Sequence, residues 1–196
     1  MNLEQCEFLA VNGILTKSTD INGWTDLAEE FWQGKGLIGS RYEYLCGPWL
    51  SRWWFHNQRV KELATIIKRK SRPVIYVGHS YGGALFSSLV KSTKIFFPAA
   101  HLFAPAAQCD FEANGFNSAL RSGRLGKLFI YGSNNDDVLK HAWLSGLGTL
   151  GRAGPGETID PTVKDRVIRD WRDNYGHSNW FYKNNLKDSL ELTKRI

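Results

Sequence analysis

A strand, a sharp turn and a helix are expected in succession over residues 73–90, and this feature limits the possible folds more than any other. Residues 74–77 are β-branched or aromatic, residues 78–83 read GHSYGG, and an apolar helical pattern follows. The turn has the form G-x-S-x-G, whose glycines remove Cβ atoms where strand and helix pass closest. Ser80, at the tip, would present its Oγ as a nucleophile. The alternative is a glycine-rich turn with an incidental serine, but the flanking strand and helix are the context that the motif requires.

Predicted strands alternate with predicted helices along the rest of the chain. Apolar residues recur at helical spacing over residues 24–31 and 60–67. The expected strands are 7–11, 41–46, 74–77, 100–104, 127–131 and 167–171. This order predicts an α/β fold, with a mostly parallel sheet of about six strands and helices on both faces. The whole chain, residues 1–196, is expected to form a single domain. Residues 146–160, with five glycines, are expected to form a mobile loop.

The composition is that of an ordinary globular protein, with 42% hydrophobic and 22% charged residues. No apolar run approaches the ~20 residues that span a bilayer, and no leader pattern opens the chain, so we expect no transmembrane segment and a cytoplasmic location. The three cysteines, Cys6, Cys46 and Cys109, lack metal-ligand spacing and fit a reduced compartment.

The formal net charge of +6 raises the question of a nucleic-acid partner. The basic residues are spread along the chain, and the densest run, residues 68–72, closes a predicted helix, where cations complement the helix dipole. No nucleic-acid-binding signature accompanies this run. The sequence therefore predicts no nucleic-acid partner.

A serine nucleophile needs a general base, and the chain offers five histidines: His56, His79, His101, His141 and His177. Catalytic groups gather outside the carboxyl ends of parallel strands, which favours His177, placed after the last expected strand. His79 adjoins the serine and would point away from its Oγ, and His101 lies inside an expected strand. Both are therefore expected to be packed or hydrogen-bonded rather than catalytic. His141 is the alternative base.

The acid that orients the base should also follow a strand. The segment after the strand 127–131 reads GSNNDDV and supplies two candidates. Asp136 is favoured because its position beyond the Gly-Ser turn would aim the carboxylate across the strand ends, and Asp137 is the alternative. Spacing alone does not separate them. The carboxylate that does not serve the base is expected to face solvent or to cap the helix near Val138.

The chain resembles the α/β-hydrolase family in its elbow (GHSYGG), its acid segment (GSNNDDV), its late histidine (GHSNW) and the order Ser80, Asp136, His177. The resemblance implies an oxyanion hole formed by the backbone amides of Tyr81 and Ile14, with Asn12-Gly13 standing where His-Gly is common. It also implies a compact member without a large cap domain, in which no metal or organic cofactor is required.

The function expected from this resemblance is a serine hydrolase that cleaves a carboxylic ester of a small molecule through an acyl-enzyme. Thioesterase or acyltransferase activity would use the same triad, and a non-catalytic binding protein on the same fold is a further alternative. The sequence does not indicate an oligomeric state. The aromatic residues of segment 49–55, with Tyr42 and Tyr44, could line an acyl pocket or form an exposed patch, but core packing is the preferred interpretation.

Overall fold

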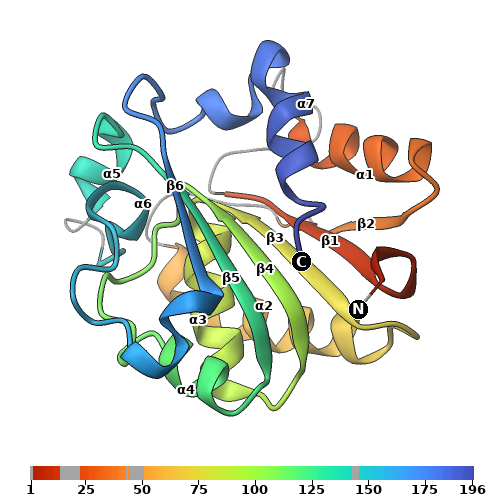
Figure 1. Ribbon diagram of the computed structural model, residues 1–196, viewed down its shortest axis with the longest axis horizontal. Helices are drawn as coiled ribbons and strands as arrows, with labels where there is room; N and C mark the ends of the chain where they lie inside the picture. Colours follow the sequence, from red (N-terminus) through yellow and green to blue (C-terminus); the bar gives the residue numbers. More distant parts are fainter. Residues whose placement is uncertain (1, 14–22, 43, 45–50, 143–145) are drawn as a thin grey trace.

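A computed structural model describes residues 2–13, 23–42, 44, 51–142 and 146–196, without the side chains of residues 51–53 and 183. Its centre is a sheet of six parallel strands in the order β2-β1-β3-β4-β5-β6 (Figure 1). The strands are β1 (Glu7–Val11), β2 (Ile38–Tyr42), β3 (Val74–His79), β4 (Phe97–Phe103), β5 (Leu125–Gly132) and β6 (Val167–Trp171). The predicted parallel α/β architecture is confirmed.

Helices cover both faces of the sheet, as expected for parallel strands joined by crossover connections. One face packs against α2 (Ser51–Lys68), α3 (Tyr81–Ser92) and α4 (Phe116–Arg121). The other packs against α1 (Trp24–Gly34) and α7 (Lys183–Leu192). The short helices are α5 (Asp137–Lys140), α6 (Leu150–Ala153), and the 3-10 segments Leu3–Gln5, Pro161–Arg166 and Asn179–Phe181.

The central strands are buried on both faces, and their side chains alternate between two hydrophobic clusters. In β1, Leu9 and Val11 join the cluster beneath α2 and α3, whereas Phe8 and Ala10 join the cluster beneath α1 and α7. This is the two-residue period of a strand. Because all strands run in one direction, the segments that follow β3, β5 and β6 meet at the same edge of the sheet.

The second strand lies earlier in the chain than predicted. The expected strand 41–46 overlaps β2 only at residues 41 and 42, and residues 43, 45 and 46 lie outside the described part of the chain. β2 is an edge strand that pairs with β1 alone, so it does not need the apolar run on which the prediction relied. Gly39 allows β2 to approach α1, since a Cβ there would lie 2.8 Å from the ring of Trp32.

The glycine-rich segment 146–160 packs more closely than the predicted mobile loop. It contains α6, and two of its glycines lie against the segment that follows β4. A Cβ on Gly148 would lie 1.9 Å from the carbonyl oxygen of Ala107, and one on Gly151 would lie 2.5 Å from the carbonyl carbon of Ala104. These glycines serve close backbone packing.

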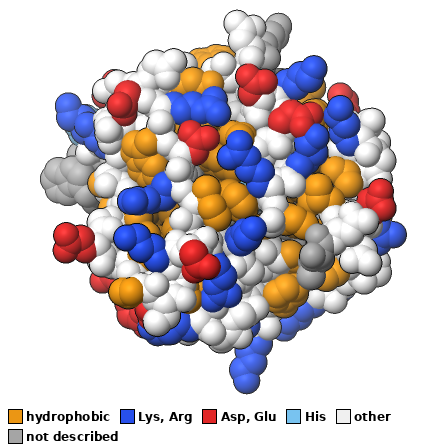
Figure 2. All heavy atoms as spheres, in the orientation of Figure 1, with side chains coloured by type: hydrophobic (Ala, Val, Ile, Leu, Met, Phe, Trp, Pro, Cys, Tyr) orange, Lys and Arg blue, Asp and Glu red, His pale blue; other side chains and the backbone are white. Residues whose placement is uncertain are grey.

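The positive charge is not gathered into a single patch on the face that Figure 2 shows. Figure 2 shows Lys and Arg side chains interspersed with Asp and Glu on the face turned to the viewer. Within the basic run, Lys70 forms an ion pair with Glu7, and its Nζ lies 3.1 Å from the Oγ of Ser40. Among the described residues, no helix is long and apolar enough to cross a membrane.

Candidate active site

Ser80 occupies the turn between β3 and α3, as the sequence predicts. Its backbone has φ 54° and ψ −115°, a conformation that non-glycine residues rarely adopt and that persists only when its surroundings hold it. The N–H of Ser80 donates to the carbonyl of Phe103 at 3.0 Å. Its carbonyl accepts from the N–H groups of Gly83 and Ala106, both at 2.9 Å. Three backbone hydrogen bonds therefore hold the strained turn.

The motif glycines allow this turn to fit against its neighbours. A Cβ on Gly78 would lie 3.1 Å from the carbonyl carbon of Gly82, where the strand passes the first turn of the helix. A Cβ on Gly82 would lie 2.8 Å from the carbonyl oxygen of Val11 at the end of β1. Backbone atoms at these distances have little freedom to move away, so both positions require glycine.

His177 follows β6 and faces Ser80. Its Nε2 lies 2.8 Å from the Oγ of Ser80, and its Nδ1 lies 2.7 Å from Oδ2 of Asp136. The His177 side chain is 10% exposed and that of Asp136 is 1% exposed. The structure thus brings together the three side chains that the sequence analysis singled out, in a continuous chain of hydrogen bonds at the carboxyl edge of the sheet.

Asp136 uses each carboxylate oxygen differently. Oδ2 faces His177, while Oδ1 accepts from the backbone N–H of Leu139 at 2.8 Å and so caps α5. Asp137 is the first residue of α5 and is exposed. Asp137 is exposed, as expected of the carboxylate that does not face the histidine, whereas the cap on α5 comes from Asp136, which has both contacts. The double contact fixes the side chain, since α5 holds one oxygen while the other faces the imidazole.

His79, which precedes Ser80, also contacts His177. Its Nε2 donates to the carbonyl oxygen of His177 at 3.0 Å, and the two rings lie 4.9 Å apart. Burial and the neighbouring His177 lower the pKa of His79 to about 3, so the ring is neutral near pH 7. Its Nδ1 has no hydrogen-bond partner among the described residues. The expectation of a packed, hydrogen-bonded histidine is confirmed, but its contact with His177 could not be predicted from local sequence.

The residues expected to form an oxyanion hole are only partly described. Tyr81 begins α3, where the first backbone N–H groups point out of the helix end. Ile14 lies outside the described residues, so its expected role stays a prediction. The neighbouring Gly13 lies directly against the serine, since a Cβ on it would be 2.9 Å from the Cβ of Ser80. The described end of the segment after β1 therefore lies beside Ser80.

The remaining histidines have other surroundings. His101 bridges the hydroxyl of Tyr131 and the carbonyl of Arg195, at 3.0 Å each, and burial lowers its pKa to about 3. It is hydrogen-bonded within the fold, as expected. His141 is exposed and follows α5. Within the described ranges, no group of three or more His, Cys, Asp and Glu side chains is arranged to hold a metal ion.

The expectation that the aromatic residues of this segment pack in the core is wrong for Trp54 and Phe55, which are exposed. Trp54 is 87% exposed and Phe55 is 45% exposed, whereas Tyr42 is buried. Trp54 and Phe55 stand near the start of α2, outside the hydrophobic core, while Tyr42 ends a strand of the sheet. Residues 49 and 50 lie outside the described residues.

Comparison with solved structures identifies the fold of the chain. No family model and no curated protein matches the sequence. Alpha/beta hydrolase domain-containing protein 10 from mouse matches with a TM-score of 0.60 and 13% identity, covering 95% of this chain and 87% of that one. Est1E from Butyrivibrio proteoclasticus gives 0.56 and 12%, covering 97% and 86%. An S-formylglutathione hydrolase from Agrobacterium tumefaciens gives 0.54 and 16%, covering 97% and 84%. The chain has the α/β-hydrolase fold.

Proposed function

We propose that the protein is a serine hydrolase that cleaves a carboxylic ester, with Ser80 as nucleophile, His177 as general base and Asp136 as the acid that orients the base. The observation that carries the proposal is the continuous contact from Ser80 Oγ to His177 Nε2 and from His177 Nδ1 to Asp136 Oδ2, at 2.8 and 2.7 Å. A serine hydroxyl is activated when it lies within hydrogen-bond reach of a base that is itself oriented by an acid.

The roles follow from the chemistry of acyl transfer. As Oγ attacks the ester carbonyl, its proton passes to Nε2 of His177, and the imidazolium that forms is stabilised by the carboxylate of Asp136. His177 then gives this proton to the leaving alcohol. Water, activated by the same imidazole, attacks the acyl-enzyme and releases the acid.

The negative charge that develops on the carbonyl oxygen requires hydrogen-bond donors. The backbone amide of Tyr81, at the first position of α3, and that of Ile14 are proposed for this role, each contributing about 3 kcal/mol of transition-state stabilisation. Gly13 supports the proposal because it lies against Ser80 and directly precedes Ile14 in the chain. No step of this route calls for a metal ion or an organic cofactor.

A thioester is a second candidate substrate for the same triad. The name of one structural neighbour, S-formylglutathione hydrolase, denotes a protein that acts on a thioester. Ester and thioester differ in the leaving atom, and the proposed groups can serve either. Parallel assays with p-nitrophenyl butyrate and butyryl-coenzyme A would rank the two classes by kcat/KM.

Steady-state hydrolysis of p-nitrophenyl butyrate tests the proposal. Ser80→Ala and His177→Ala should each lower kcat by about 10⁴-fold or more, because neither attack nor proton transfer remains. Ser92→Ala, which removes an exposed hydroxyl at the end of α3, is the matched control and should keep wild-type kinetics. A wild-type protein that hydrolyses neither class of ester would instead favour a binding protein built on the hydrolase fold.

A further inference from the structure

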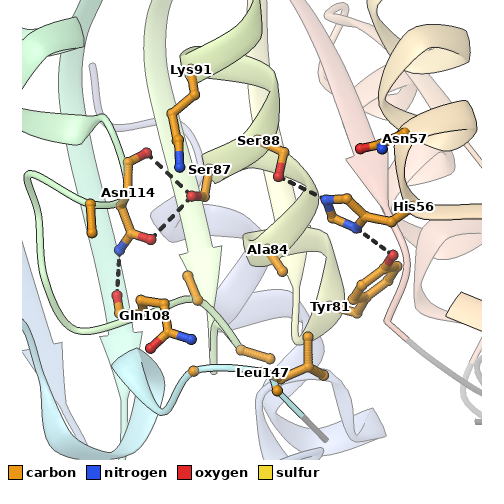
Figure 3. Close-up of a pocket in the computed structure, with 15 residues that line it drawn as sticks. His56, Asn57, Tyr81, Ala84, Ser87, Ser88, Lys91, Gln108, Asn114 and Leu147 are labelled. Atoms are coloured by element: carbon orange, nitrogen blue, oxygen red, sulfur yellow. Dashed lines mark hydrogen bonds between the residues drawn. The ribbon is translucent and has the colours of Figure 1, made fainter. Parts of the chain in front are cut away.

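A cavity of about 370 Å³ lies along one face of α3, and Tyr81, the residue after Ser80, is the first residue of α3 that lines it (Figure 3). Tyr81 and Ala106 line it, and the N–H of Ala106 donates to the carbonyl of Ser80. Ala84, Ser88 and Lys91 continue the same helix face away from the turn. The volume falls within the usual range of small-molecule sites. The cavity therefore begins at the residue that follows Ser80 and extends along the helix, while Ser80, Asp136 and His177 are not among its described lining residues.

Most of the polar groups in the cavity walls already have partners. The hydroxyl of Ser87 donates to Asn114, whose carbonyl oxygen and Oδ1 lie 3.2 and 3.1 Å away, and the Asn114 amide donates to the carbonyl of Gln108. His56 bridges the hydroxyls of Tyr81 and Ser88, at 2.6 and 2.7 Å. Satisfied groups of this kind shape a wall without demanding a ligand.

His56 adds no positive charge to the cavity near pH 7. Burial, with the nearby guanidinium of Arg59 as a second cause, lowers the pKa of this imidazole. Between the polar groups the walls are apolar, formed by the alanines at positions 84, 106, 107 and 113 and by Leu147. A ligand in this cavity would thus meet a short apolar stretch.

Lys91 differs from the other lining residues. Lys91 is exposed, and it is the only charged side chain among the described lining residues because His56 is neutral near pH 7; no carboxylate is among them. Its stem lies over Gly115, where a Cβ would be 2.5 Å from the Cγ of Lys91, so the glycine makes room for it. Figure 3 shows the side chain extending into the cavity with its nitrogen turned toward Ser87 and Asn114. The cavity therefore presents one cation without a matching anion in its described walls.

We propose that this cavity binds the part of the substrate remote from the scissile carbonyl, and that this part is an alkyl chain ending in a carboxylate that pairs with Lys91. The proposal rests on the proposed hydrolase function of Ser80. A single ammonium matches a monoanion, whereas a phosphate group carries about −1.5 to −2 charges and is usually held by several donors.

The distance between Ser80 and Lys91 along α3 sets the length of the alkyl chain. Ser80 and Lys91 are separated by eleven residues, a rise of about 16 Å. Helical side chains lean toward the N-terminus, which brings the ammonium to about 10 Å from the level of Ser80. A medium-chain dicarboxylic acid monoester, such as a suberate, spans such a distance.

Two matched probes test the charge preference. Mono-p-nitrophenyl suberate carries the terminal carboxylate, and p-nitrophenyl methyl suberate has the same chain without the charge. Wild-type protein should prefer the charged ester by about two- to fivefold in kcat/KM, mainly through KM, as expected for an ion pair with an exposed lysine. Lys91→Met should remove the preference. Lys94→Met, which removes an exposed lysine outside the cavity, should retain it. Equal kcat/KM for the two esters in the wild-type protein would overturn the proposal.

A binding measurement separates this proposal from the proposed hydrolysis. On Ser80→Ala protein, calorimetric titration with monomethyl suberate should give binding that is about two- to fivefold weaker when Lys91→Met is added. Binding of this kind in a protein that never hydrolyses esters would support the cavity site while the proposed function fails. The absence of binding to Ser80→Ala, or equal binding with and without Lys91→Met, would overturn the cavity site whatever the hydrolytic activity.

Discussion

Asp136→Asn is expected to abolish catalysis while leaving the fold almost as stable as before. Asparagine caps a helix about as well as aspartate, so its amide oxygen can keep the bond from Leu139 that caps α5. The amide NH₂ would then face Nδ1 of His177, and two donors cannot pair. The imidazole is forced into the tautomer with hydrogen on Nε2, which cannot accept the Ser80 proton. A loss of about 10⁴ in kcat is expected, equivalent to about 5 kcal/mol.

Asp136→Ala should lose stability as well as activity. It removes the cap, at about 1 kcal/mol, and leaves the buried imidazole N–H unsatisfied, at about 1–3 kcal/mol, so the unfolding free energy should fall by about 2–4 kcal/mol. Asp137→Asn changes an exposed side chain and should stay within about 0.5 kcal/mol of wild type with full activity.

The assays are p-nitrophenyl butyrate kinetics and urea unfolding on the three variants. The contrast between Asn and Ala at one position separates the orienting role from the capping role. Retention of kcat within tenfold of wild type by Asp136→Asn would refute the reasoning. So would a large kinetic loss in Asp137→Asn, which would move the acid by one residue.

Three further predictions concern two buried histidines and Gly13. His79 and His101 have folded pKa values of about 3, below the usual 6.5, so in that window the unfolded chain binds more protons and stability falls as pH falls. Each contributes up to about 1.4 kcal/mol per pH unit, and His101→Phe should reduce the slope of unfolding free energy measured from pH 6.5 to 4.5; an unchanged slope would contradict this. Gly13→Ala would place a methyl group against Ser80 and should lower kcat about 10²-fold without abolishing expression. A variant with wild-type kcat would contradict this. His79→Leu, which removes the bond to the His177 carbonyl, should lower kcat about tenfold with KM unchanged, and His79→Gln should restore much of it; equal kinetics for both would exclude a role for that bond.

The central features could be predicted because each depends on local chemistry. The turn around Ser80 requires glycines at fixed spacing, and the strand before it and helix after it are visible as a change of apolar period. Parallel topology then brings the segments that carry Asp136 and His177 to the same edge, although they lie far apart in sequence. Fold and candidate site therefore follow from pattern plus topology.

Other features depend on contacts that no local pattern encodes. β2 is held by one neighbour and by the close approach of Gly39 to Trp32, so it lacks an apolar signature. The double use of Asp136 depends on where α5 begins, which spacing alone does not determine. The cavity beside α3 joins residues from α2, α3 and the segments after β4 and β5, and only the folded chain brings His56 and Lys91 to the same walls.

Fluorophosphonate labelling followed by mapping of the modified peptide tests the central claim most directly. The reagent reacts with a serine whose hydroxyl is activated by a neighbouring base, and it requires no knowledge of the substrate. We predict one label per chain on Ser80 of the native protein, with labelling lost in Ser80→Ala and strongly slowed in His177→Ala. A native protein that takes up no label, or takes it up on another serine, would contradict the assignment of Ser80 as an activated nucleophile.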